Sequence, residues 1–151
     1  MVVLFIDTDV LAIHHLFLRD KRREENERFL AHVRTKRPNI TIHNLLELCG
    51  LFAVANQQNK VQVIYREYLE SQDLNIFFPR TYDDWPRRLE RILEVIERGH
   101  SYGDTLVTSA AEMGEVEVFV TWNTKHFEGS INAKVLSPRM YLQENVSVTE
   151  K

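Results

Sequence analysis

The chain has 151 residues, of which 44% are hydrophobic and 27% are charged, which is typical of a soluble globular protein large enough to bury a core. Its net charge of −3 carries no bulk signal for nucleic-acid binding, and the single cysteine, Cys49, excludes an internal disulfide. No segment approaches the roughly 20 apolar residues of a membrane helix, and the short apolar start has no basic residue before it, so we expect a cytoplasmic protein with no membrane span and no secretory signal.

Apolar periodicity and turn residues predict strands that alternate with helices along one domain. The continuous apolar run 2–6 indicates a strand buried on both faces, as in a parallel sheet. Such alternation favours parallel βαβ units. The domain is predicted to cover residues 1–142, and the polar residues 143–151 are expected to form a C-terminal tail. Further strands are expected at 39–42, 74–78, 116–121 and 133–136, and helices at 10–18, 22–34, 44–55, 61–69, 85–99 and 104–113.

Basic residues concentrate between Arg19 and Arg37, where eight Lys and Arg residues stand against four acids. On a helix such residues usually form a solvated face, which is the interpretation that we favour. Attraction of phosphate backbones to this segment is the alternative.

Two acids, Asp7 and Asp9, directly follow the first predicted strand, at the sheet edge where open α/β folds bind ligands. A carboxylate that follows five buried apolar residues needs partners, because burying an unpaired charge is costly. One acid suffices to cap the helix that comes next. We therefore assign the cap to Asp9 and a ligand role to Asp7.

Glu47 is the only charged residue in the segment from Leu45 to Ala55, which is so apolar that it predicts a helix buried on all sides. Asn44 is expected to cap this helix. Because a fully buried Glu is almost never unpaired, Glu47 either pairs with an Arg or Lys in the core or belongs to a metal site.

Two more candidates lie later in the chain. Asp104 stands at a predicted helix start, where it either serves a site or forms a capping box with Ser101. Asn123 follows the strand 116–121 and offers a neutral oxygen ligand, with an ordinary turn residue as the alternative. The neighbouring Thr121 is placed to hydrogen-bond a carboxylate or a water.

The sequence lacks the motifs of several other kinds of catalytic site. The adjacent His14 and His15 point to different sides of a helix, and the histidines show no zinc-ligand spacing, so we predict that they do not cluster around zinc. Glycine is too scarce for a phosphate-binding loop. Hard oxygen ligands select Mg²⁺ or Mn²⁺, and such a cation would relieve the repulsion between the acids. The remaining set is all-oxygen and consists of Asp7, Glu47, Asp104 and Asn123.

Four segments, in this order and over nearly the whole chain, resemble PIN-domain ribonucleases of the kind found in VapC-type toxins. The resemblance implies a three-layer α/β/α sandwich with a central, mostly parallel five-stranded sheet, and an endoribonuclease that depends on Mg²⁺ or Mn²⁺. The segments are Asp7-Thr8-Asp9-Val10-Leu11 after an apolar strand, Asn44-Leu45-Leu46-Glu47-Leu48, Tyr102-Gly103-Asp104-Thr105-Leu106, and Val120-Thr121-Trp122-Asn123-Thr124-Lys125-His126-Phe127.

The same resemblance assigns roles to individual residues. Asp7 and Asp104 would bind the metal, and Glu47 would help to hold it or orient the attacking water. Asn123 stands where many members carry a fourth acid, which puts the number of metal ions in question. Lys125 is a candidate for a phosphate contact, with a solvated loop lysine as the favoured alternative. RNA would be the substrate, and an antitoxin protein and a second copy of the chain would be the partners.

Two other functions compete with this interpretation. A haloacid-dehalogenase-like phosphatase would use Asp7 as nucleophile and Asp9 as general acid. That family carries two acids in a motif late in the chain, and here no second acid follows Asp104. This function also leaves Glu47 unexplained. A catalytically weak PIN-like module that binds RNA or assembles a complex is favoured by Asn123 and the modest net charge, and the three retained acids argue against it.

Overall fold

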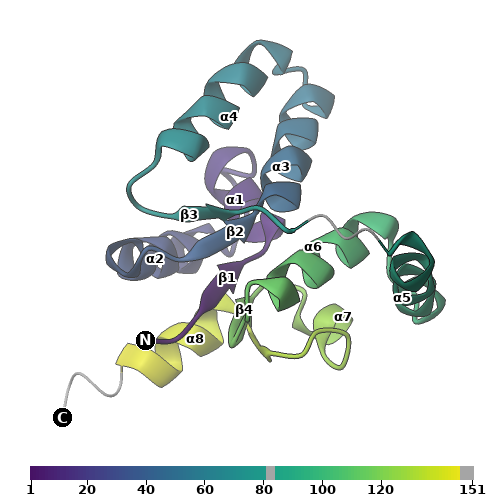
Figure 1. The fold of residues 1–151 in the computed structure, drawn as a ribbon. Coiled ribbons are helices and arrows are strands. Elements are labelled where there is room, and N and C mark those ends of the chain that lie inside the picture. Colours follow the sequence, from purple (N-terminus) through teal and green to yellow (C-terminus); the bar gives the residue numbers. More distant parts are fainter. Residues whose placement is uncertain (81–83, 147–151) are drawn as a thin grey trace.

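The computed structural model describes residues 1–80 and 84–146. Short strands alternate with helices, as predicted (Figure 1). The strands are β1 (Leu4–Ile6), β2 (Asn39–Thr41), β3 (Asn75–Phe77), β4 (Val118–Val120) and β5 (Lys134–Leu136). The helices are α1 (Thr8–His15), α2 (Arg23–Val33), α3 (Ile42–Val54), α4 (Val61–Glu70), α5 (Trp85–Glu97), α6 (Tyr102–Met113), α7 (Thr124–Phe127) and α8 (Pro138–Val146), with 3-10 turns at Arg34–Lys36 and Gln58–Lys60.

The five strands form one sheet in the order β3-β2-β1-β4-β5, and all four pairings are parallel. The chain starts at the central strand, builds outward through β2 and β3, and then returns to the other side of β1 with β4. The strand order therefore reverses between β1 and β4, and the carboxyl ends of these two strands mark the point where such sheets bind ligands.

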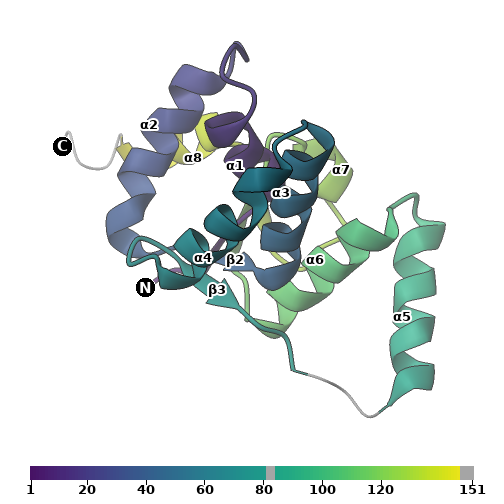
Figure 2. The ribbon, with the colours of Figure 1, turned by 90° about the horizontal axis from the view of Figure 1, so that it is seen from above.

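Alternate residues of the central strands face opposite layers. Leu4 and Ile6 of β1 belong to a core shared with α1, α2, α3, α4 and α8, whereas Phe5 packs with Phe119 of β4 against α6 and α7. Figures 1 and 2 show helices on both sides of the sheet. Burying a side chain such as Phe5, which is 1% exposed, contributes about 1.5–3 kcal/mol. The predicted three-layer α/β/α sandwich with a parallel five-stranded sheet is confirmed.

Helix α5 lies at the rim of the molecule, beside α6 (Figures 1 and 2). The apolar stripe that the sequence predicts is present, but only part of it is covered. Ile92 and Val95 are buried, while Trp85, Leu89 and Leu93 are each at least 50% exposed. Apolar side chains at helical spacing therefore remain exposed along α5, and we call them the apolar surface of α5.

Two local predictions were wrong, and one helix was not predicted. The cap of α3 is Thr41, and Asn44 is its partner at the third helical position, because each side chain bonds the other's backbone amide in a capping box. Helix α3 is not buried on all sides, since Leu46 is 53% and Val54 83% exposed. No helix was expected at Pro138–Val146, although Ser137 before Pro138 is a typical start signal.

The predicted tail from residue 143 begins inside α8, and its residues 147–151 lie outside the described part of the chain. The domain boundary at residue 142 stays a prediction. Within residues 1–80 and 84–146, no helix is long and apolar enough to cross a membrane.

Two glycine substitutions test the packing of β1 on α6. A Cβ added to Gly114, which ends α6, would lie 2.5 Å from Cζ of the buried Phe5. We expect Gly114→Ala to lower the free energy of unfolding by about 1–3 kcal/mol because the ring has no room to move. Gly50→Ala, inside α3 with nothing within 4 Å, should instead raise it by up to about 1 kcal/mol. Urea unfolding of both variants measures this, and equal effects would contradict the packing described.

Candidate active site

A cleft of about 590 Å³ opens beyond the carboxyl ends of β1 and β4. It brings together the four candidates that the sequence singled out, although they lie on separate elements: Asp7 follows β1, Glu47 is on α3, Asp104 is in the first turn of α6 and Asn123 follows β4. Lys125 is exposed and is not among the cleft residues. The lining consists of Asp7, Thr8, Asp9, Ala12, Phe17, Glu47, Gly50, Leu51, Val54, Asp104, Asn123, His126 and Phe127.

The strand register places Asp7 beside Thr121. Ile6 pairs with Val120, and the Asp7 amide donates to the Val120 carbonyl at 2.9 Å, so the next residues of the two strands stand next to each other. The Thr121 hydroxyl donates to Asp7 Oδ2 at 2.9 Å, which confirms the predicted contact of this threonine with a carboxylate. Burial and the nearby charge of Asp9 raise the pKa of Asp7 well above its ordinary value.

The roles assigned to Asp7 and Asp9 need correction. Helix α1 begins at Thr8, and Asp7 is its cap, accepting from the Thr8 amide at 2.8 Å. Asp9 lies in the first turn, and its Oδ2 accepts from the Trp122 amide at 2.9 Å and from the Thr121 hydroxyl at 3.1 Å. The single hydroxyl proton of Thr121 thus serves two carboxylates and can satisfy only one of them at a time.

Asp9 is therefore a member of the site that the sequence analysis left out. Its Oδ1 is buried with no hydrogen-bond partner among the described residues. Burial raises the pKa of this carboxyl group, and the nearby guanidinium of Arg22 opposes that effect. An orphan carboxylate oxygen next to a second acid is a position where a cation would be stabilised.

Glu47 is half-buried and points into the cleft instead of the core. The Asn44 side-chain amide donates to Thr8 Oγ1 at 2.9 Å, and the Thr8 hydroxyl donates to Glu47 Oε2 at 2.5 Å, so a short polar chain orients the carboxylate. No ion pair of Glu47 occurs in the described ranges, which excludes the core Arg or Lys partner considered from the sequence there. Burial, together with Asp104, raises its pKa.

The absence of a side chain at Gly103 leaves room for the Glu47 carboxylate next to the start of α6. A Cβ at this position would lie 3.0 Å from Glu47 Oε1, so a larger residue here would displace the Glu47 carboxylate by a few tenths of an ångström. The next residue, Asp104, forms the capping box with Ser101 that the sequence allowed. Its carboxylate also contacts the ring of His126, with Oδ2 lying 2.7 Å from Nε2.

Asn123 is exposed at the mouth of the cleft, and its side chain forms no cap for α7. The backbone amide of Asn123 donates to Thr121 Oγ1 at 3.1 Å, which ties this loop to the hydroxyl shared by the two aspartates. The structure therefore places Asn123 beside the site and assigns it no contact to the acids.

The prediction that the histidines do not cluster was wrong for His100 and His126. Their Nδ1 and Nε2 atoms lie 3.2 Å apart, and both rings stand next to Asp104. Burial and the neighbouring His126 lower the pKa of His100. A signal was present in the sequence, since His100 precedes Asp104 by four residues and His126 follows Asn123 by three.

The residues of the cleft fit a divalent metal ion. Its lining contains four carboxylates, from Asp7, Asp9, Glu47 and Asp104, and neither Lys nor Arg within the described chain. Three of these acids have raised pKa values because burial opposes their charged form. Such a set is unfavourable when ionised and matches the oxygen ligands that Mg²⁺ and Mn²⁺ prefer.

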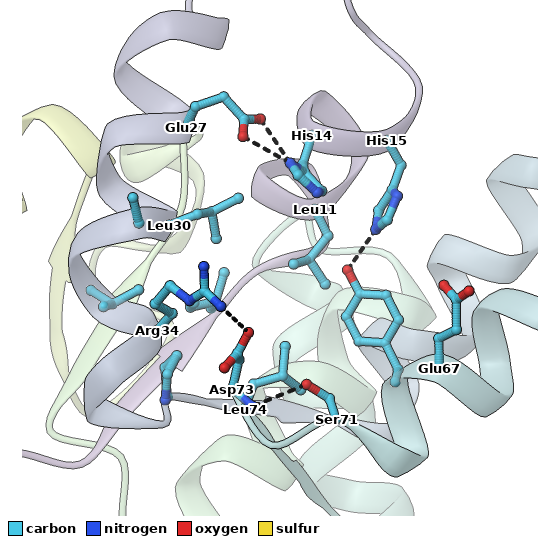
Figure 3. Close-up of a pocket in the computed structure, with 15 residues that line it drawn as sticks. Leu11, His14, His15, Glu27, Leu30, Arg34, Glu67, Ser71, Asp73 and Leu74 are labelled. Atoms are coloured by element: carbon cyan, nitrogen blue, oxygen red, sulfur yellow. Dashed lines mark hydrogen bonds and ion pairs between the residues drawn. The ribbon is translucent and has the colours of Figure 1, made fainter.

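A second cavity, of about 480 Å³, lies between α1, α2 and α4 (Figure 3). Its polar groups pair with one another: His14 with Glu27, His15 with the hydroxyl of Tyr68, and Arg34 with Asp73. Burial and His14 lower the pKa of His15 to about 4. None of the predicted site residues lies here, so the acidic cleft remains the candidate active site.

Comparison with known proteins finds likeness in structure alone. No family model matches the sequence, and no curated protein matches it either. VapBC2 from Rickettsia felis, solved with a DNA fragment from its promoter, matches with a TM-score of 0.64 and 17% identity over 89% of this chain and 98% of that one. FitAcB from Neisseria gonorrhoeae matches with a TM-score of 0.61 and 15% identity over 91% of this chain and 99% of that one. FitAB bound to an IR36 DNA fragment matches with a TM-score of 0.59 and 16% identity over 90% of this chain and 95% of that one.

The chain has a PIN/VapC-like fold. The predicted resemblance is thus confirmed at the level of the fold. Within this PIN-like fold the acidic cleft occupies the carboxyl ends of the central strands, where the reversal of strand order leaves room for a ligand.

The raised pKa of Asp7 has a consequence for stability. A carboxyl group whose pKa is higher in the folded state than its ordinary 3.8 binds its proton more tightly when folded, so it lowers stability as the pH rises through that raised pKa. Asp7→Asn removes this charge. In EDTA at pH 7 we expect the variant to unfold with a free energy about 1–2 kcal/mol higher than the parent chain, with the difference shrinking toward pH 4.

Urea unfolding across this pH range makes the measurement. Asp73→Asn serves as the control, because it removes an exposed partner of Arg34 and should change stability by less than about 1 kcal/mol in the opposite direction. A large loss of stability in Asp7→Asn at pH 7 would mean that the carboxylate is held by a favourable ion pair.

Proposed function

We propose that this chain is an endoribonuclease that depends on Mg²⁺ or Mn²⁺ and hydrolyses RNA phosphodiester bonds as a VapC-like toxin. The observation that carries the proposal is the convergence of four carboxylates in one cleft of a PIN-like fold, with no lysine or arginine in its described lining. Such a set favours binding of a divalent ion over binding of a bare anion, and a phosphodiester is a substrate that an ion can bring to it.

Each residue has a role in this proposal. Asp7 and Asp104 would hold the ion, and Glu47 would hold it or orient the attacking water. When bound, the ion supplies a more acidic water and stabilises charge on the phosphate. The Thr121 hydroxyl lies within hydrogen-bond distance of both Asp7 and Asp9 and donates to one of them at a time. Asn123 stands at the cleft mouth, where RNA would enter. Lys125 remains a candidate for a contact with phosphate outside the cleft.

The direct test incubates the purified protein with a structured RNA and, separately, with a phosphate monoester, in Mg²⁺, Mn²⁺ or EDTA. We expect cleavage of the RNA with either metal and none in EDTA. Asp7→Asn and Asp104→Asn should each lower the rate by about 100-fold or more, because both remove a charge that holds the ion. Asp73→Asn, an exposed acid outside the cleft, should keep the parent rate.

The alternatives give different results in the same assay. Turnover of the monoester without cleavage of RNA would favour the phosphatase. Asp9 is poorly placed as its general acid, because Oδ2 accepts two hydrogen bonds and Oδ1 is buried. RNA binding without cleavage, unchanged in Asp104→Asn, would favour the non-catalytic module. Either result would reject the nuclease.

The proposal includes protein partners. The structural neighbours were solved as VapBC2 and FitAB complexes on DNA, and by analogy we propose that an antitoxin protein binds this chain and blocks its cleft. The cytoplasmic location of this chain also stays a prediction. The apolar surface of α5 supports the second predicted partner, another copy of the chain, because Trp85, Leu89 and Leu93 are each at least half exposed and neighbouring exposed apolar side chains often mark an interaction site.

A double substitution tests the homodimer. Leu89→Glu with Leu93→Glu places two charges on the exposed surface of α5, and we expect it to shift the protein from dimer to monomer in light scattering behind size exclusion. The control is Leu46→Glu with Val54→Glu, which charges exposed apolar positions of α3 and should leave the dimer intact. A parent chain that is monomeric at high concentration would reject the dimer.

A further inference from the structure

His100, Asp104 and His126 meet at the edge of the acidic cleft. Their ligand atoms all lie within 4.8 Å of one another, although the residues come from the loop before α6, from α6 itself and from α7. His100 is 7% exposed, whereas the side chains of His126 and Asp104 are 31% and 26% exposed. A small ion can therefore reach the group from the cleft, which His126 and Asp104 both line.

The hydrogen bonds of the group require one arrangement of protons. Asp104 Oδ2 lies 2.7 Å from His126 Nε2, so in this hydrogen bond the nitrogen donates and the carboxylate oxygen accepts. His100 Nδ1 lies 3.2 Å from the same nitrogen and must then present a lone pair. The neutral His100 ring keeps its proton on Nε2, from which it donates to Ser130 Oγ at 2.5 Å.

This arrangement is the one that a metal-binding histidine adopts. A ligating imidazole usually donates its other ring N–H to an oxygen of the protein, which orients the ring and selects the tautomer. Ser130 plays that part for His100. The lone pair of His100 and the carboxylate of Asp104 both face the single Nε2 proton of His126. A divalent cation in the place of this proton would contact all three ligand groups.

The donor set differs from that of the rest of the cleft. Two imidazole nitrogens and one carboxylate oxygen suit zinc and the neighbouring late first-row metals, whereas Mg²⁺ prefers oxygen alone. A tetrahedral zinc ion with bonds of about 2.0–2.1 Å separates its ligand atoms by about 3.3 Å. The two nitrogens already have this spacing, at 3.2 Å, and the Asp104 oxygen, 2.7 Å from His126 Nε2 and within 4.8 Å of the His100 ligand atom, must adjust its position.

We propose that His100, Asp104 and His126 form a binding site for a zinc-class divalent ion, separate from the all-oxygen site of Asp7 and Glu47 and joined to it by Asp104. Three protein ligands leave a fourth position of the ion open toward the cleft. The site does not depend on the reaction that the cleft performs, so it stands or falls independently of the nuclease proposal.

Calorimetric titration of the EDTA-treated and desalted protein with Zn²⁺ tests the site. We expect one tight site in the parent chain, weakened at least tenfold in His100→Gln and in His126→Gln, since even the loss of a supporting contact costs a ligand site about 10–100-fold. His32→Gln, on α2 and outside the cluster, is the matched control and should bind like the parent. Asp7→Asn should also keep the zinc site, because Asp7 is not among its ligands.

Mn²⁺ provides the converse measurement, since its binding should weaken in Asp7→Asn and persist in His100→Gln. The Co²⁺-substituted parent chain tests the ligands without any substitution and should show the intense visible absorption of a tetrahedral nitrogen and oxygen site. Absence of a tight zinc site in the parent chain, zinc binding by both histidine variants as tight as that of the parent chain, or only the weak absorption of octahedral Co²⁺ would each overturn the proposal.

Discussion

Ile6 of β1 pairs in register with Val120 of β4, and the position of the acidic cleft follows from this contact. The pairing sets Asp7 beside Thr121 at the point where the two strands end, and from there one chain segment enters α1 while the other turns toward α7. Thr121 then holds Asp7 and Asp9 with a single hydroxyl. Because both central strands are buried on both faces, these polar groups can meet only at the strand ends, where backbone and side chains are freed from the sheet.

The rest of the molecule stabilises a site that is unfavourable by itself. Asp7, Asp9 and Glu47 all resist ionisation because burial opposes their charge, and the oxygen Oδ1 of Asp9 has no partner among the described residues. The two cores on either side of the sheet, with side chains such as Phe5 and Phe119 almost fully buried, offset this cost. An ion that binds the acids would bind the folded state alone and so add to stability through mass action.

Asp104 links two kinds of donor within this cleft. On one side it stands near Glu47, and the absence of a side chain at Gly103 leaves room for the Glu47 carboxylate there. On the other side it contacts His126 and, through it, His100. The capping box of α6 anchors the backbone of Asp104, so its carboxylate is held between oxygen and nitrogen neighbours by the helix start itself. The oxygen set and the imidazole pair therefore present different ligand chemistry to metal ions at adjacent positions.

Sequence alone determined the alternation of strands and helices and the parallel sheet, because apolar runs are local patterns that report burial directly. It also singled out Asp7, Glu47, Asp104 and Asn123 as candidates, because polar residues stand out beside such runs. It did not determine which aspartate caps α1, that Asp9 joins the site, or that Glu47 faces a cleft, since side-chain direction depends on where each helix begins. Nor could it bring His100 to His126, which are 26 residues apart and meet only when α6 and α7 cover the same face of the sheet. Only the tertiary structure decided these points, because the residues concerned lie on different helices and loops. The distances between such elements leave no periodic pattern in the sequence.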